Sequence, residues 1–115
     1  MINYNGKCFR PISNSVNGNV SKEMIFRYFQ TGNVLTCNYS GEKIQYGSLL
    51  ALVSPDGTLD MRYHQLNDSG ELMTGICTST PEFLTDGRIR LHEKWQWTSG
   101  DKTPGESLLE EIVSA

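Results

Sequence analysis

Turn signals recur at short, regular intervals along the chain, and this spacing most constrains what the chain can fold into. Glycine and asparagine tolerate the positive φ angles that tight hairpin turns require. The segments between the turns are rich in β-branched and aromatic residues, which is typical of β-strands. The signals are Asn17-Gly18, Thr31-Gly32, Ser40-Gly41, Pro55-Asp56-Gly57, Asp68-Ser69-Gly70, Asp86-Gly87 and Ser99-Gly100.

Eight segments between these turns predict β-strands joined by hairpins. They are residues 5–12, 22–30, 34–39, 44–53, 58–66, 71–79, 88–98 and 106–113. An antiparallel up-and-down meander of about eight strands closes into a small barrel that leaves no exposed edge. We therefore expect an all-β fold in which residues 1–115 form a single β-barrel domain. The apolar spacing of residues 106–113 also suits an amphipathic helix, although closure of the barrel favours a strand.

The charge and the hydropathy of the chain limit the kinds of partner that we expect it to bind. Ten basic and thirteen acidic residues are scattered along the chain and give a formal net charge of −3, with no basic stripe for nucleic acid. The longest apolar run, residues 49–53, is far shorter than the ~20 residues of a membrane span. The N-terminus has no apolar signal core, so we expect a cytoplasmic protein with no nucleic-acid or membrane partner.

The chain has no motif that organises a metal, a cofactor or a catalytic centre. Cys8, Cys37 and Cys77 lie in separate segments with no CxxC spacing, which predicts reduced thiols and no zinc site. His64 and His92 lack HxH or HExxH spacing, and no P-loop, GxGxxG or GxSxG is present. We expect no metal and no cofactor, and a non-catalytic role is favoured over an enzyme.

The segment RIRLHEKWQW, which begins at Arg88, carries both tryptophans of the chain beside several charged residues. Alternate side chains of a strand point to opposite faces. One face carries Ile89, Leu91, Glu93, Trp95 and Trp97, and is apolar enough to point inward. A buried Glu93 needs a partner or a raised pKa, whereas at the barrel mouth it stays in contact with water.

A second segment, LDMRYHQLN at residues 59–67, places Tyr63 and Gln65 on one face. Across a closed lumen they can approach Glu93, Trp95 and Trp97. Aromatic walls with a few convergent polar groups are the usual make-up of a small-molecule site. Two tryptophans at i and i+2 also suit a packed barrel core, so both interpretations stay open.

The opposite faces of the same two segments carry four cationic or titratable side chains, which are Arg62, His64, Arg90 and His92. On the outside of a barrel they form a solvated surface or a homodimer contact. If the inside and outside faces are reversed, they form a cationic lumen suited to a carboxylate or a phosphate, with arginine as the bidentate binder.

Several blocks of the chain resemble a family of short bacterial proteins often labelled N-acetylglutamate synthase. The blocks are YNGKCFRPISNS (4–15), LDMRYHQLN (59–67), GELMTG (70–75) and DGRIRLHEKWQWTSGD (86–101), and the likeness covers about residues 4–113. The label implies transfer of an acetyl group from acetyl-CoA to glutamate. The glycine-containing loop that opens a helix and binds the pyrophosphate in such transferases is not found in this chain.

The meander also resembles the calycin group of small barrels, which includes lipocalins, fatty-acid-binding proteins and avidin-like proteins. That likeness implies a lumen that holds one small molecule, although the lipocalin Gly-x-Trp near the N-terminus is not found here. Three functions remain open. They are a binding protein for a partly apolar, anionic small molecule; an enzyme with a lumenal Glu or His acid–base; and a homodimeric interaction protein whose barrel is filled.

Overall fold

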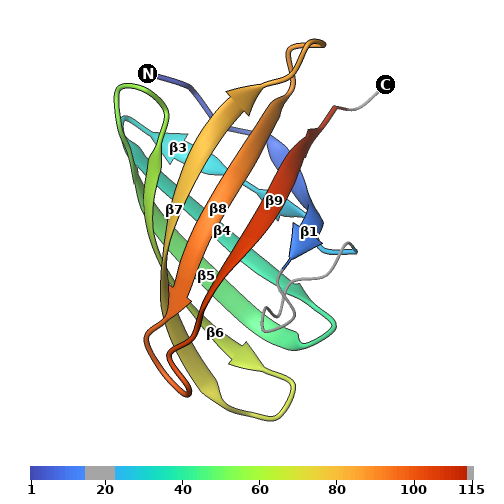
Figure 1. Ribbon diagram of the computed structural model, residues 1–115, viewed down its shortest axis with the longest axis vertical. Coiled ribbons are helices and arrows are strands. Elements are labelled where there is room, and N and C mark those ends of the chain that lie inside the picture. Colours follow the sequence, from blue (N-terminus) through green and yellow to red (C-terminus); the bar gives the residue numbers. More distant parts are fainter. Residues whose placement is uncertain (15–22, 114–115) are drawn as a thin grey trace.

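Nine antiparallel strands follow one another as a meander that curls on itself (Figure 1). They are β1 (Cys8–Asn14), β2 (Phe26–Arg27), β3 (Phe29–Thr31), β4 (Val34–Gly41), β5 (Ile44–Val53), β6 (Leu59–Asn67), β7 (Leu72–Phe83), β8 (Ile89–Trp97) and β9 (Pro104–Ile112). The computed structural model describes residues 1–14 and 23–113. β9 returns to pair with β1, so the sheet forms a nearly closed barrel and the predicted all-β barrel is confirmed. None of these residues forms a helix long and apolar enough to cross a membrane.

One short stretch of chain bridges the two ends of the sheet. β2 pairs with β1, and β3 pairs with β4. Between them, Tyr28 donates its backbone N–H to the carbonyl of Lys7 at 2.9 Å and accepts the N–H of Gly6 at 2.8 Å. The chain therefore changes hydrogen-bond partner directly after Tyr28, and the barrel is closed by two half-strands.

The prediction of a single strand over residues 22–30 is wrong, because β2 and β3 are separate strands with different partners. The alternation of buried and exposed side chains continues from Phe26 through Tyr28, so the side-chain pattern carries no sign of the change of partner. The predicted start of that strand at residue 22, and the turn predicted at Asn17-Gly18, lie outside the described residues.

The last segment is a strand, β9, as closure of the barrel predicted. β7 is longer than predicted, because it continues past residue 79 to Phe83 and includes Pro81. Its pairing with β6 ends at Ser79, and the remainder pairs with β8 alone. Proline is tolerated where a strand has only one neighbour, because its missing N–H can then face the side that has no partner strand.

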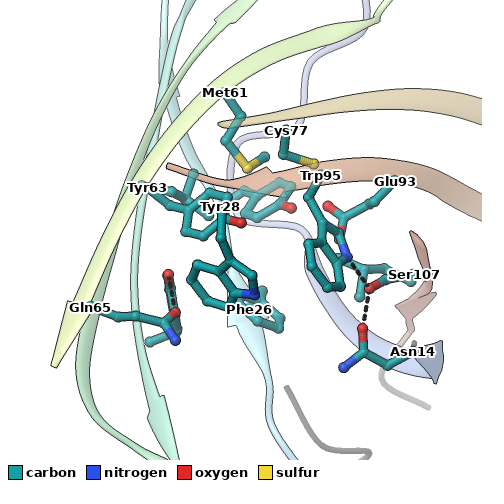
Figure 2. A pocket seen from close by; sticks show the side chains of 14 residues that line it. Asn14, Phe26, Tyr28, Met61, Tyr63, Gln65, Cys77, Glu93, Trp95 and Ser107 are labelled. Atoms are coloured by element: carbon teal, nitrogen blue, oxygen red, sulfur yellow. Dashed lines mark hydrogen bonds between the residues drawn. The ribbon is translucent and has the colours of Figure 1, made fainter. Parts of the chain in front are cut away.

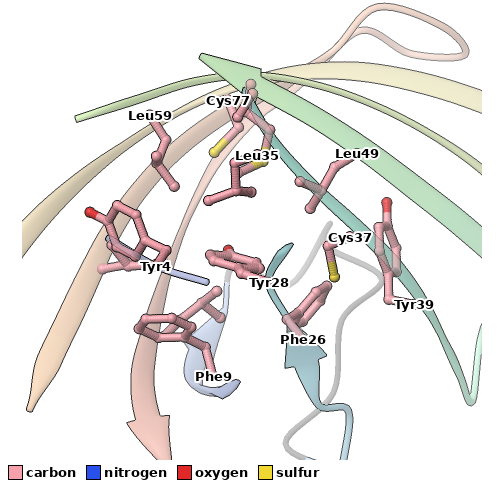
Figure 3. Close-up of a cluster of buried hydrophobic side chains, with 14 of the residues drawn as sticks. Tyr4, Phe9, Phe26, Tyr28, Leu35, Cys37, Tyr39, Leu49, Leu59 and Cys77 are labelled. Carbon is pink, nitrogen blue, oxygen red and sulfur yellow. The ribbon is translucent and has the colours of Figure 1, made fainter. Parts of the chain in front are cut away.

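The N-terminal segment covers one end of the barrel. The Tyr4 hydroxyl donates to the carbonyl of Gly57, in the β5–β6 loop, at 2.6 Å. The rings of Tyr4, Phe9 and Tyr28 pack together behind it with centroid separations of 5.1–6.3 Å (Figure 3). These three rings and Leu35 are fully buried, so this end of the lumen is filled.

Three inward-facing glycines make room for aromatic rings on neighbouring strands. The pairs are Gly47 with Tyr39, Gly75 with Tyr63 and Gly105 with Trp95, each directly opposite in register. A Cβ atom added at any of the three glycines would meet the ring at under 3.0 Å. Glycine at these positions therefore lets a large ring lie flat against the barrel wall instead of pointing across the lumen.

We expect Gly105→Ala to lower the free energy of unfolding by about 1–3 kcal/mol, because the new methyl group displaces the packed Trp95 ring. Urea denaturation measures the change. In a Trp95→Phe background the smaller ring leaves space, so the same substitution should cost less. An equal loss of unfolding free energy in the two backgrounds would contradict the packing of the Trp95 ring against Gly105.

Candidate functional site

A partly open pocket of about 60 Å³ lies in the lumen, beyond the filled end (Figure 2). One water needs roughly 10–15 Å³, so the space holds a few waters or the buried part of a small molecule. Five of the residues singled out from the sequence line it, and these are Tyr63, Gln65, Glu93, Trp95 and Trp97. The barrel is therefore not completely filled by its own side chains.

The two tryptophans form an aromatic wall together with Tyr63. Trp95 and Trp97 are 9% and 5% exposed, and their rings meet edge to face at 5.8 Å. Tyr63 packs against Trp97 in the same manner at 5.5 Å. Both tryptophans belong to the core cluster, against which Tyr63 packs, and they also line the pocket, so the two interpretations of the tryptophans are compatible.

A chain of hydrogen bonds holds the Trp95 indole in place. Its Nε1–H donates to the Ser107 hydroxyl at 2.8 Å, and Ser107 donates in turn to Oδ1 of Asn14. The three residues come from β8, β9 and β1, and all line the pocket. Sequence reasoning missed Ser107 and Asn14. Ser107 falls on the inward face of β9 and could have been found by alternation, whereas Asn14 follows a register shift in β1.

Glu93 lies between two serines on the inward face of the barrel. Ser79 and Ser107 are its register partners on β7 and β9, and the Ser79 hydroxyl donates to Glu93 Oε2 at 2.9 Å. Glu93 retains some solvent accessibility because it lines the pocket, but protein surrounds its carboxyl group. Burial raises the pKa of Glu93 from 4.5 to about 7, and the Ser79 hydrogen bond opposes this shift only in part.

Two buried polar atoms in the pocket wall, the Tyr28 hydroxyl and Gln65 Nε2, have no hydrogen-bond partner among residues 1–14 and 23–113. Gln65 Oε1 is satisfied, since it accepts from the Tyr39 hydroxyl at 3.1 Å. Burial raises the pKa of Tyr28 well above its ordinary value, so its hydroxyl keeps its proton. Tyr28 had no sequence signal as a site residue, because its position depends on the break between β2 and β3.

The four cationic or titratable side chains predicted for the opposite face do not reach the lumen. Arg62, His64 and His92 are exposed and Arg90 is half-buried, all on the outer surface. The alternative of a cationic lumen is therefore wrong. The reason is the strand period, because Tyr63 and Glu93 point inward and their immediate neighbours must then point outward.

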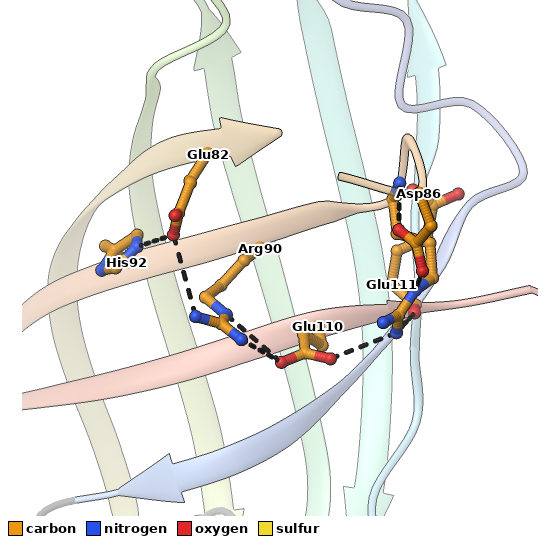
Figure 4. A network of polar contacts seen from close by, with 7 residues as sticks. Glu82, Asp86, Arg90, His92, Glu110 and Glu111 are labelled. Atoms are coloured by element: carbon orange, nitrogen blue, oxygen red, sulfur yellow. Dashed lines mark hydrogen bonds and ion pairs between the residues drawn. The ribbon is translucent and has the colours of Figure 1, made fainter. Parts of the chain in front are cut away.

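On the outer surface, three of these side chains pair with acids, and Figure 4 shows the pairs of Arg90 and His92. Arg90 donates to Glu110 Oε2 at 2.8 Å, and His92 Nε2 lies 2.7 Å from Glu82 Oε1. Arg62 lies 2.7 Å from Asp60 on its own strand. Such exposed pairs contribute little to stability.

Other reactive groups show no organised centre. Across residues 1–14 and 23–113, no cluster of three or more His, Cys, Asp or Glu side chains could hold a metal ion. Burial raises the pKa of Cys37 to about 12 and shifts the pKa of Cys77 upward as well, so both thiols stay protonated. Protonated, buried thiols are poor nucleophiles.

A nearly closed antiparallel meander with a pocket in its lumen is a calycin-like barrel. The family model described as avidin-like protein matches residues 2–112, and the chain therefore belongs to the avidin-like family. No curated protein and no solved structure matches the chain significantly. The label N-acetylglutamate synthase is not addressed by these comparisons and stays a prediction.

We expect Glu93→Gln to be more stable than the native chain at pH 8, by about 1–3 kcal/mol, and nearly equal to it at pH 4.5. The folded chain binds this proton up to a pKa of about 7 and the unfolded chain only to about 4.5. Stability is therefore greatest at low pH and is lost as pH rises between these values. Urea denaturation across that range measures it.

Glu106→Gln is the matched control, because Glu106 lies exposed on the outer face of β9. This variant should not show the gain in stability at pH 8 that is expected of Glu93→Gln. A Glu93→Gln variant with the same stability difference at both pH values would contradict the burial of Glu93.

Proposed function

We propose that the protein binds a small, partly apolar molecule in the barrel lumen. One observation carries the proposal: two buried polar atoms, Tyr28 Oη and Gln65 Nε2, lack partners among the described residues and belong to the wall of the same pocket. An unpaired buried polar group costs about 1–3 kcal/mol. A ligand that hydrogen-bonds both atoms recovers that free energy.

The composition of the pocket wall supports a partly apolar ligand. Most of the pocket surface comes from aromatic and aliphatic side chains such as Trp95, Trp97 and Met61. Membership of the avidin-like family also suggests small-molecule binding. The anionic character expected from the sequence finds no support in the wall, because no described Lys, Arg or His lines the pocket.

An enzyme that uses Glu93 as a general acid or base is the second candidate. The favouring observation is the pKa of about 7, which suits proton transfer near neutral pH. His64 and His92 point away from the lumen, so Glu93 would act without a histidine partner. Incubation of the pure protein with acetyl-CoA and glutamate tests the acetyltransferase form of this candidate.

Native mass spectrometry of protein purified from its own organism tests the binding proposal. We expect a retained small molecule at one copy per barrel, and the spectrum also reports whether a homodimer forms. Biotin is a suitable added probe, given the family to which the chain belongs. Protein that retains no molecule and gains none from a panel of small apolar probes would contradict the proposal.

Tyr28→Phe separates binding from folding. Because the Tyr28 hydroxyl has no partner in the described part of the chain, its removal should leave the free energy of unfolding of the ligand-free protein unchanged or slightly higher. The retained molecule should bind about tenfold more weakly, which corresponds to one lost hydrogen bond. Tyr46→Phe is the control, since Tyr46 is exposed on the outer face of β5 and should change neither quantity. Fluorescence titration of the emptied protein provides the affinities.

A further inference from the structure

Glu93 is an acid in an aromatic pocket, and no side chain of the described residues gives it a cationic partner. It accepts a hydrogen bond from the neutral Ser79 hydroxyl. Within the described chain, no Lys, Arg or His contributes to the pocket wall. The basic side chains within β8, Arg90, His92 and Lys94, lie on its outer face, where Arg90 pairs with Glu110 and His92 with Glu82. Residues 1–14 and 23–113 therefore contribute no basic side chain to the pocket that could neutralise an ionised Glu93.

The other titratable groups around Glu93 are neutral. They are Tyr28 between β2 and β3, Tyr39 and Cys37 on β4, Tyr63 on β6 and Cys77 on β7. Burial raises the pKa of each of these groups, so none is charged near neutral pH. On the remaining sides, β1 and β9 present Asn14 and Ser107 to the pocket, which are uncharged. Glu93 is thus the single charge that the described wall can present.

The walls of the pocket suit a positive charge. Six aromatic rings line it, from Phe26, Tyr28, Tyr39, Tyr63, Trp95 and Trp97. The face of an aromatic ring carries partial negative charge and attracts cations, most strongly in tryptophan. The same rings shield Glu93 from water, which strengthens its attraction for an ion of opposite charge.

We propose that the lumen selects a small organic cation with N–H donors, such as an amidinium or a primary ammonium group, which binds Glu93 as a charge-assisted hydrogen-bond pair. This inference rests on the proposed binding function and names the class of ligand. Two further polar atoms fit such a guest. The Tyr28 hydroxyl can accept a second N–H from the cation, and Gln65 Nε2 can donate to an oxygen elsewhere on the ligand. Figure 2 shows Glu93 and Gln65 at separate sides of the pocket, so the ligand is held at two places.

Three probes of nearly the same planar shape isolate the effect of charge, and they are acetamidinium, acetamide and acetate. Trp95 and Trp97 are the two tryptophans of the chain and both line the pocket, so their indole NMR signals report on binding without a label. At pH 8 we expect acetamidinium to bind at least tenfold more tightly than either other probe.

Protonation of Glu93 should remove that preference. The cation needs the carboxylate, so its affinity should fall at least tenfold between pH 8 and pH 5.5, while the affinity for acetamide changes little. Glu93→Gln should abolish the preference at pH 8 and retain acetamide binding. Glu106→Gln should leave the full preference in place.

Equal affinities for the three probes at pH 8, or a preference for acetate, would overturn the cation inference and leave the binding proposal intact. A cation preference that survives in Glu93→Gln would also overturn it, because the rings alone would then account for selectivity. No indole shift with acetamidinium at 100 mM overturns it as well. The proposal that the lumen binds a small molecule fails only if native mass spectrometry also shows no retained molecule.

Discussion

The structure depends on the change of hydrogen-bond partner at Tyr28. A meander closes into a barrel only if one strand pairs with both the first and the last strand of the remaining sheet. Here two half-strands each provide one of these two pairings. β2 and Tyr28 pair with the β1 side, and β3 pairs with β4. Closure satisfies backbone groups that would otherwise form exposed edges. It also fixes the Tyr28 side chain in the lumen, where no other described residue hydrogen-bonds its hydroxyl.

The interior of this barrel is filled unevenly, and that unevenness creates the site. Toward the end covered by Tyr4, rings and leucines fill the lumen. Farther along, glycines let the rings of Tyr63 and Trp95 lie against the wall, and a pocket of about 60 Å³ remains. Glu93 accepts a hydrogen bond from the neutral Ser79 hydroxyl, and no Lys, Arg or His among the described residues lines the pocket to act as its counter-ion. The buried, ionised carboxylate of Glu93 lowers the stability of the fold, and the same carboxylate is the group proposed to bind the ligand.

Much of this arrangement follows from the two-residue period of strands. Alternation along β6 and β8 was sufficient to place Tyr63, Gln65, Glu93, Trp95 and Trp97 on one face, and the structure shows that face in the pocket wall. The remainder depends on contacts between distant segments. Neither the break after Tyr28 nor the register shift before Asn14 changes the local pattern of residues. Pairing of Gly105 with Trp95 depends on register between strands, which alternation alone does not provide.

Glu93 is enclosed in the lumen, and the described residues that line the pocket offer it no counter-ion. Titration of the Glu93 side-chain carboxyl carbon by NMR, in protein emptied of any ligand, tests this claim most directly. The account predicts a titration midpoint near pH 7, because burial outweighs the Ser79 hydrogen bond. A midpoint near 4.5, the ordinary value for a glutamate, would show a solvated carboxylate and would contradict the account.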